Sequence, residues 1–307
     1  MPADVCGPAL LFCPGDRPER FAKALAAADS VILDLEDAVG TEHKDLARAH
    51  VVEALARLDR ESVLVRVNAP GTPWHTDDLA ALAPFRDVVV MLPMAASAAA
   101  VEAVPHPVVA LCETARGILN APEIASAANC VGVMWGSEDL VADLGGRRGR
   151  AADGSYRPAV EEARTRVLYA ARAAGVTPID TVLVDIADLD TLAADSAAAV
   201  ASGYAAKACI HPRQVAVVRQ AFRPSDDEMR WAQGVLAAAE AETGVFTFDG
   251  RMVDAPVLAH AREVLREASA PVAVHRRQPG VAPGDPVPRV RGAVRARGAD
   301  GRGGRGR

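Results

Sequence analysis

Acidic side chains stand where a short apolar run of this sequence ends. Residues 31–39 read VILDLEDAV, so the apolar residues of a strand-like run give way to Asp34, Glu36 and Asp37. In a barrel of parallel strands the active site lies at the carboxyl ends of the strands, so acids at this position favour a metal site or a proton-transfer site. A solvated turn that caps the next helix is the alternative for one acidic cluster taken alone.

Short apolar runs alternate with amphipathic segments along most of the chain. Continuously apolar strands separated by helices imply a parallel sheet that is covered on both faces, and eight such units predict an α/β fold, a (β/α)8 TIM barrel. An open doubly wound sheet is the alternative, but it requires a glycine fingerprint after the first strand, where PGDRPERF has one glycine. The eight strands are expected at residues 9–14, 31–37, 62–68, 88–93, 108–114, 130–136, 181–186 and 206–212.

Two helical stretches, at about 225–242 and 254–268, are surplus to such a barrel. The expected organisation is therefore a barrel over 1–224 and a C-terminal helical extension over 225–270. Extra helices of this kind pack on the barrel or contact a neighbouring subunit, so we expect a homo-oligomer, a trimer or a hexamer.

The last 37 residues, 271–307, hold nine Arg and two Asp and are rich in Pro and Gly without apolar periodicity. This composition predicts a disordered tail. Nucleic acid binding through the tail is an unlikely function, and an extension without a selected role is the favoured interpretation.

The composition excludes several classes of protein. Half of the 307 residues are apolar, and the formal net charge is −6, which fits a folded protein with a sizeable core. No run approaches the roughly 18 apolar residues of a membrane helix, and the N-terminus does not have the pattern of a secretion signal, so we expect a cytoplasmic protein with no membrane partner. The five cysteines lack CxxC spacing and fit reduced thiols better than disulfides or zinc ligands.

Charged and polar residues follow most of the predicted strands. A helix cap or a salt bridge would explain any one of them. Neither explains why several converge at one end of the barrel, because burying carboxylates together is unfavourable unless a cation neutralises them. These residues are Arg17, Asp34, Glu36, Asp37, Arg66, Asn68, Glu113, Glu138, Asp139, Asp185 and His211.

Carboxylates without His-rich or Cys-rich partners indicate a hard cation that prefers oxygen, so Mg²⁺ is a better prediction than zinc. Glu113 and Asp139 are the predicted ligands, since both stand at strand-to-loop junctions. With Arg66 nearby, such a site suits a substrate with an α-keto or α-hydroxy carboxylate, because the guanidinium can hold the carboxylate in a two-pronged grip. The pattern therefore predicts enolate chemistry.

The motifs LLFCPGDRPERFAKA, VILDLEDAV, VRVN, ETARG, MWGSEDL, ACIHPRQ and MVDAP follow one another between residues 9 and 268. In this order they resemble the citrate lyase β-subunit-like branch of the HpcH/HpaI aldolase family. The greatest resemblance is to its stand-alone actinobacterial members, which cleave β-hydroxyacyl-CoA thioesters. The resemblance implies a magnesium-dependent carbon–carbon lyase.

The resemblance also implies roles for individual residues. Glu113 and Asp139 would hold magnesium, with Asp37 bonding to metal-bound water, and Arg66 would hold the carboxylate of the keto acid. Contacts to substrate would come from Phe12, Arg17, Lys23, Glu138, Ile210 and His211, of which Phe12, Arg17 and Lys23 would bind coenzyme A and Ile210 and His211 would line the thioester end.

Five positions remain open at this stage. Read from the residues alone, Arg17 and Lys23 are ordinary charges on a helix surface, and His211 is a structural histidine before Pro212. Asp254 in MVDAP would reach the active site of the next subunit in related enzymes, whereas from sequence alone it caps a helix. The relatives usually carry Lys in the fourth-strand motif where this chain has Met94, which leaves the acid substrate open.

These observations predict cleavage of a carboxylated β-hydroxyacyl-CoA, such as malyl-CoA or citramalyl-CoA, into acetyl-CoA or a related acyl-CoA and an α-keto acid. A β subunit of a citrate lyase complex, acting on a citryl thioester, is the enzymatic alternative. An inactive barrel that serves as a binding protein is the alternative of another class, and the presence of Glu113, Asp139 and Arg66 argues against it.

Overall fold

Eight parallel strands pair in chain order and close into a barrel, because β8 pairs with β1. The computed structural model describes residues 5–240, 242 and 244–269. The predicted (β/α)8 barrel is therefore confirmed. Its strands are β1 (Ala9–Pro14), β2 (Ser30–Asp34), β3 (Val63–Arg66), β4 (Val89–Leu92), β5 (Val108–Cys112), β6 (Cys130–Trp135), β7 (Thr177–Asp180) and β8 (Ala206–Cys209).

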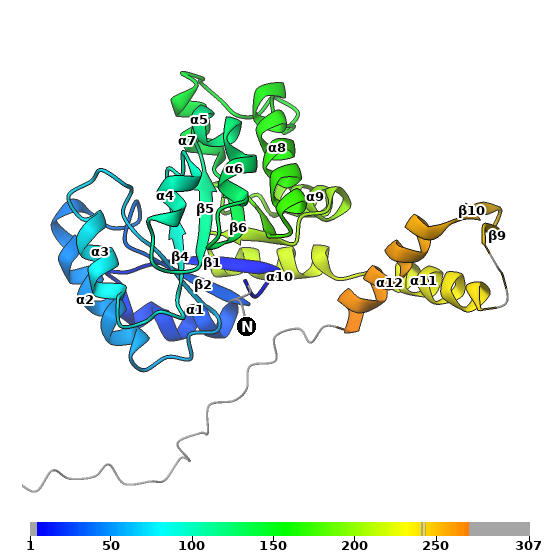
Figure 1. Cartoon of the computed structure of the whole chain (residues 1–307), viewed down its shortest axis with the longest axis horizontal. Coiled ribbons are helices and arrows are strands. Elements are labelled where there is room, and N and C mark those ends of the chain that lie inside the picture. The colour runs from blue at the N-terminus through cyan, green and yellow to red at the C-terminus, as the bar shows by residue number, and fades with distance from the viewer. Residues whose placement is uncertain (1–4, 241, 243, 270–307) are drawn as a thin grey trace, which may run out of the picture. The chain divides into compact units, whose positions relative to one another are not determined.

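Helices follow each strand and surround the barrel (Figure 1). Two connections carry more than one helix: α5 and α6 lie between β5 and β6, and α7 and α8 lie between β6 and β7. Short 3-10 helices at Pro18–Arg20 and Thr41–His43 precede α1 and α2. The helices of the barrel are α1 (Phe21–Ala27), α2 (Lys44–Leu55), α3 (His75–Leu82), α4 (Ala98–Glu102), α5 (Ala115–Leu119), α6 (Ala121–Ala125), α7 (Ser137–Asp143), α8 (Pro158–Ala174), α9 (Leu189–Ser202) and α10 (Pro212–Phe222).

The apolar runs form strands because both of their faces are buried. Alternate residues such as Ile32, Leu64 and Met91 pack together in one cluster inside the barrel. Their neighbours, such as Val31 and Val65, pack in a larger cluster with apolar residues of the surrounding helices. Burial on both faces explains why the strands read as continuous apolar runs rather than as an alternating pattern.

The prediction for the seventh strand is wrong. The strand lies at Thr177–Asp180, directly before the predicted 181–186. The segment VTPID contains Pro178, which cannot donate to a strand ladder, so the apolar run after it is the more strand-like sequence. Pro178 is nevertheless accommodated, because its carbonyl accepts a hydrogen bond from the Ala205 N–H at 3.1 Å. Asp185 consequently ends no strand; it is exposed and accepts a hydrogen bond from the Ala187 N–H at 2.9 Å.

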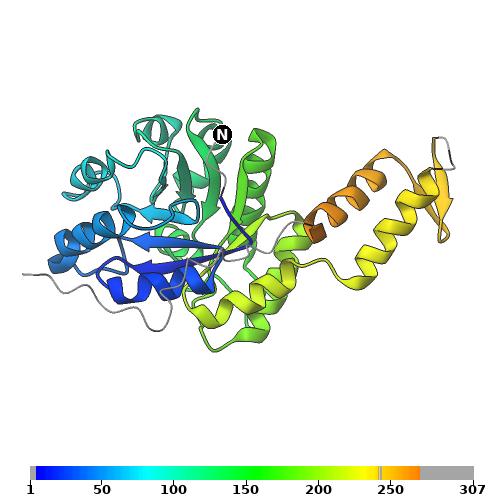
Figure 2. The same ribbon diagram turned by 90° about the horizontal axis from the view of Figure 1, so that it is seen from below.

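Two long helices follow the barrel, α11 (Asp226–Ala239) and α12 (Ala255–Ser269), and they lie side by side in both views (Figures 1 and 2). A short antiparallel pair, β9 (Phe246–Phe248) and β10 (Arg251–Val253), connects them. Residues such as Val235, Val253 and Val264 form a separate apolar cluster within this extension. The extra C-terminal helices are therefore present and have a core of their own.

Two of the expectations stay predictions. The Arg-rich tail at 271–307 lies outside the described residues, and the division of the chain into domains at 224 and 270 is not tested. Within the described residues, no helix combines the length and the apolarity that a membrane span requires.

Candidate active site

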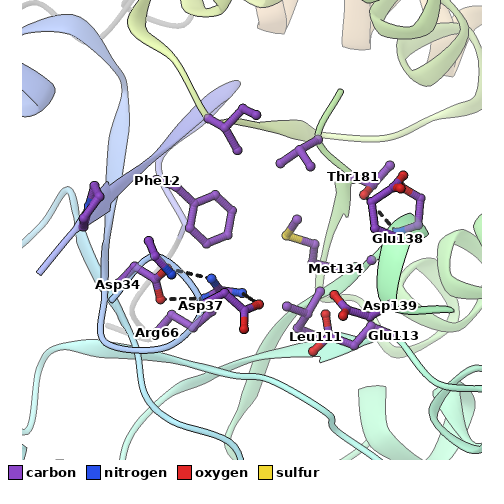
Figure 3. Close-up of a pocket in the computed structure, with 16 residues that line it drawn as sticks. Phe12, Asp34, Asp37, Arg66, Leu111, Glu113, Met134, Glu138, Asp139 and Thr181 are labelled. Carbon is purple, nitrogen blue, oxygen red and sulfur yellow. Dashed lines mark hydrogen bonds and ion pairs between the residues drawn. The ribbon is translucent and has the colours of Figure 1, made fainter. Parts of the chain in front are cut away.

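A cavity of about 360 Å³ lies at the carboxyl ends of the barrel strands. Its lining combines acids and one arginine with an apolar wall (Figure 3). The sequence-predicted residues that line it are Phe12, Asp37, Arg66, Glu113, Glu138, Asp139 and Ile210, together with Asp34 from the first acidic cluster. Most of the predicted site is thus brought together in one place.

Glu113 follows the last residue of β5, where the strand reaches the mouth of the barrel. Its side chain is 3% exposed, and Oε1 accepts a hydrogen bond from the Met94 N–H at 2.8 Å. Burial raises the pKa of Glu113 to about 8, and the negative charge of Asp139 adds to this effect, whereas the Met94 N–H opposes it. In the absence of a cation, Glu113 therefore carries a proton at neutral pH.

Asp139 lies in the first turn of α7, the helix that follows β6. Its side chain lies beside that of Glu113 (Figure 3). Burial raises the pKa of Asp139, and the charge of Asp37 contributes, while Arg66 acts in the opposite direction. The two predicted metal ligands are therefore neighbours whose pKa values are both raised.

Arg66 ends β3, and its guanidinium is bound by acids of the chain itself. Nε and Nη2 donate to the two carboxylate oxygens of Asp34 at 2.7 and 2.6 Å. Nη1 lies 3.0 Å from Glu36 Oε2 and donates to Asp37 Oδ2 at 3.4 Å. Arg66 therefore ties β3 to the loop after β2 and also presents its guanidinium to the cavity.

The three acids of the VILDLEDAV segment have different roles. Asp34 is fully buried and also accepts hydrogen bonds from the N–H groups of Glu36 and Ala38, so it shapes the turn after β2. Glu36 is buried against Arg66, and burial raises its pKa to about 8 although Arg66 opposes this. Asp37 is 69% exposed and is the acid of the three that offers its carboxylate most openly to the cavity.

Much of the remaining lining of the cavity is apolar. Leu111, Met134, Val182 and Ile210 contribute to it, and the centre of the Phe12 ring lies 4.9 Å from the guanidinium carbon of Arg66. A cation over an aromatic face is an attractive arrangement that keeps the Arg66 side chain in place. The cavity can therefore receive a ligand with a carboxylate at one end and an apolar part beside it.

Four predicted site residues do not line this cavity in their own chain. Arg17 and Lys23 are exposed, and Arg17 lies 3.7 Å from Asp16. His211 caps α10, where Nδ1 accepts a hydrogen bond from the Arg213 N–H at 3.2 Å, so its structural role is observed. Asp254 caps α12, where Oδ1 accepts from the Val257 N–H at 3.3 Å.

Sequence reasoning missed a buried network beneath the mouth. Lys207 donates to Asp180 at 2.9 Å and to the carbonyl of Thr181 at 2.8 Å, while Arg164 and Trp135 donate to the other oxygen of Asp180 at 3.2 and 2.9 Å. Burial alone would raise the pKa of Asp180, but Lys207 and Arg164 hold it below its usual value. The network holds the backbone of Thr181, which lines the cavity. In the sequence, the segment TPID is the signal that could have indicated it.

The donor set of the cavity fits a hard divalent cation. Two neighbouring carboxylates, that of Glu113 buried and that of Asp139 half-buried, lie in the place where a cation would neutralise both. Neither Cys nor His lines the cavity, and the described residues contain no cluster of three or more His, Cys, Asp or Glu side chains arranged to hold a metal. Two carboxylates with the remaining positions left to water and substrate suit magnesium better than zinc.

Two family models and several known proteins match the chain. The model of the family described as HpcH/HpaI aldolase/citrate lyase matches residues 9–212, and that of the C-C bond lyases of the TIM-barrel fold matches residues 158–270. The chain is 51% identical over 263 residues to the citrate lyase subunit beta-like protein of Mycobacterium tuberculosis, covering 85% of this chain and 96% of that protein. It is 36% identical over 276 residues to a (3S)-malyl-CoA thioesterase of Cereibacter sphaeroides, covering 85% of this chain and 94% of that enzyme.

A solved structure extends the similarity to three dimensions. The crystal structure of the protein CitE from M. tuberculosis, in complex with magnesium, acetoacetate and coenzyme A, matches with a TM-score of 0.82 and 51% identity, over 86% of this chain and 98% of that one. Both family models and the similar proteins agree with the predicted resemblance. The chain therefore belongs to the HpcH/HpaI aldolase/citrate lyase family and is a carbon–carbon lyase.

Proposed function

We propose that this chain is a magnesium-dependent lyase that cleaves a carboxylated β-hydroxyacyl-CoA, such as malyl-CoA or citramalyl-CoA. The products are acetyl-CoA or a related acyl-CoA and an α-keto acid. One observation carries the proposal: the adjacent carboxylates of Glu113 and Asp139 line the same cavity as the guanidinium of Arg66.

Glu113 and Asp139 would hold the magnesium ion. When bound, the ion would neutralise the two carboxylates and polarise the oxygen of the reacting acid. Magnesium commonly uses one or two protein carboxylates and leaves its other positions to water and substrate, which agrees with the two ligands that the chain supplies. The similar M. tuberculosis protein was crystallised with magnesium, which supports the same ion here.

Arg66 would orient the keto-acid carboxylate. Its Nη2 carries a second hydrogen besides the one given to Asp34, and the side chain lines the cavity. The bonds to Asp34 fix the plane of the guanidinium in advance, so less rotational freedom is lost when the substrate binds. Asp37, which also contacts Arg66, would accept hydrogen bonds from water held at the metal site.

Cleavage then follows the reverse of a Claisen condensation. The hydroxyl proton of the substrate passes to a base, the oxygen forms the carbonyl of the keto acid, and the carbon–carbon bond to the acyl group breaks. The electron pair of that bond passes to the thioester as an enolate, which gains a proton to give the acyl-CoA. Buried polar groups that are fixed before the reaction stabilise such developing charge.

The thioester end would lie against the apolar wall. Phe12 and Ile210 are placed to contact it, since both line the cavity, and Phe12 lies across it from Glu113 and Asp139 (Figure 3). Arg17 and Lys23 would bind the phosphates of coenzyme A at the surface, where both side chains are exposed to solvent. Glu138 lines the cavity beside Asp139, and His211 lies next to Ile210 as the cap of α10.

Asp254 would act in the site of a second copy of the chain. It does not line the cavity of its own chain, and it starts a helix in an extension that has a separate core. A homo-oligomer, a trimer or a hexamer, would bring this carboxylate to a neighbouring mouth, where it would return the proton to the enolate. We expect this assembly to work in the cytoplasm, where coenzyme A thioesters are available.

Thioester hydrolysis is a second candidate activity. The similarity to a (3S)-malyl-CoA thioesterase favours it, because cleavage and hydrolysis begin from the same bound thioester. A citryl thioester on a carrier protein, the substrate of a citrate lyase complex, is the alternative for the lyase itself.

The test is a set of thioesters offered to the purified protein with Mg²⁺. Malyl-CoA, citramalyl-CoA, their opposite stereoisomers and a citryl thioester are compared, and free keto acid and free coenzyme A are both measured. Keto acid released together with acyl-CoA supports the lyase, and free coenzyme A without keto acid supports hydrolysis alone. Absence of both products for every CoA thioester, with turnover of the citryl thioester, would contradict the proposed substrate class.

A further inference from the structure

Gly136 lies between β6 and α7 in a conformation that does not need glycine. Its backbone angles are φ −114° and ψ 117°, which are ordinary extended values for any residue. Glycine is usually selected for a positive φ or for a close approach of another group. The φ of Gly136 is negative, so a close approach of another group remains as the reason for glycine at this position.

The close neighbour of Gly136 is Glu113. A Cβ atom added to Gly136 would lie 2.7 Å from Glu113 Oε2 and 2.9 Å from Glu113 Cβ. Real Cβ atoms do not approach other atoms this closely, and the Cβ of Glu113 cannot move without its strand. Any side chain at 136 therefore displaces the carboxylate of Glu113.

Met94 holds the same carboxylate from the other side. Its φ is +51°, a left-handed value that is uncommon for a residue other than glycine, and its N–H donates to Glu113 Oε1 at 2.8 Å. Strained backbone conformations persist where the surrounding structure fixes them, and they concentrate at functional sites. The carboxylate of Glu113 thus has one oxygen bonded to Met94 and the other against Gly136.

We infer that Gly136 and the Met94 N–H are positioning groups that fix the Glu113 carboxylate for the metal ion. This inference rests on the proposed function, in which Glu113 is a magnesium ligand. The missing side chain of Gly136 leaves room for Oε2, while the Met94 N–H holds Oε1. Groups that orient a metal ligand in this way typically affect metal affinity by about 10- to 100-fold.

The test is the affinity of Gly136→Ala for Mg²⁺ in the full chain, measured by isothermal titration calorimetry without substrate. We expect binding about 10- to 100-fold weaker than in the original protein. Gly40→Ala is the matched control, because its Cβ would also approach a glutamate carboxylate, that of Glu42 at 2.8 Å, but Glu42 is exposed and can turn away. Weakened Mg²⁺ binding in Gly136→Ala and unchanged Mg²⁺ binding in Gly40→Ala support the inference. If the two variants bind Mg²⁺ with the same affinity, the inference is overturned.

A second measurement separates this inference from the proposed function. The loss of Tm caused by Gly136→Ala is determined in the original protein and in a Glu113→Gly background, without metal. Because Glu113→Gly removes both the carboxylate and the Cβ that a side chain at 136 would meet, the loss should be smaller in that background, and equal losses would overturn the inference. If Gly136→Ala fails to fold, a folded double variant supports the inference and an unfolded one overturns it. If the original protein binds no Mg²⁺, the metal site fails, and this comparison still decides whether Gly136 makes room for Glu113.

Discussion

The guanidinium of Arg66 donates to both carboxylate oxygens of Asp34, through Nε at 2.7 Å and Nη2 at 2.6 Å. Burial would lower the pKa of Arg66, but the charge of Asp34 and the hydrogen bonds to it more than compensate. The residue proposed to hold the keto acid is therefore also a structural tie between β3 and the end of β2. Replacing Arg66 can therefore change either the kinetics or the stability of the protein.

Arg66→Lys should lower kcat/KM by at least about tenfold although the charge is kept. Charge-assisted hydrogen bonds contribute about 1.5–3 kcal/mol each, and an ammonium group cannot hold Asp34 by two parallel hydrogen bonds and also donate to the substrate. The measurement is steady-state kinetics together with thermal unfolding of the same variant. A large loss of Tm with unchanged kcat/KM would mean that Arg66 only ties the strands.

The stability of the metal-free protein should fall as pH rises from about 5 to 8, because burial raises the pKa of Glu113 to about 8. The folded state then binds more protons than the unfolded state, whose Glu titrates near 4.3, so the stabilisation is complete below that value and is lost as pH rises through 8. Glu113→Gln cannot titrate and should lose less stability over this interval. Denaturant unfolding at several pH values in EDTA measures the difference, and parallel curves for the two proteins would contradict the prediction.

The fold was predictable because the barrel strands are apolar on both faces, and this pattern identified seven of the eight strands. The seventh was missed because Pro178 made TPID look unlike a strand, and with it the buried Asp180 was missed. At the site, Glu113, Asp139 and Arg66 could be found from their position after apolar runs. The Met94 N–H and the space at Gly136 could not, because a backbone group and an absent side chain leave no distinctive residue type in the sequence.

Two inactive variants should restore each other's activity if Asp254 acts in a neighbouring site. Mixed oligomers of Asp254→Ala and Glu113→Ala contain some mouths with both carboxylates, since Glu113 would come from one chain and Asp254 from another. Co-expression followed by activity measurement tests this. The control is Glu113→Ala mixed with Asp139→Ala, which cannot restore a mouth because both residues belong to the same one. Equal activity in the two mixtures would contradict a role for Asp254 across subunits.

Arg17→Ala and Lys23→Ala should each raise KM for the CoA thioester by about 5- to 20-fold with little change in kcat. Charge-assisted hydrogen bonds to phosphate contribute to binding in the ground state and the transition state alike. Arg148→Ala is the control, because Arg148 is an exposed arginine in a groove that adjoins the cavity through Ser137, Glu138 and Val182. A rise in KM for Arg148→Ala alone would place the phosphates in that groove.

The most direct test of the account is keto-acid release from a cleaved thioester, measured with Mg²⁺ and with EDTA, in the original protein and in Glu113→Ala. Glu123→Ala, at an exposed position of α6, serves as the control. The account predicts release only with Mg²⁺, full release in Glu123→Ala, and loss of release in Glu113→Ala with a nearly unchanged Tm, because removing the carboxyl also removes the cost of burying it beside Asp139. Undiminished release in EDTA, or full release in Glu113→Ala, would contradict it.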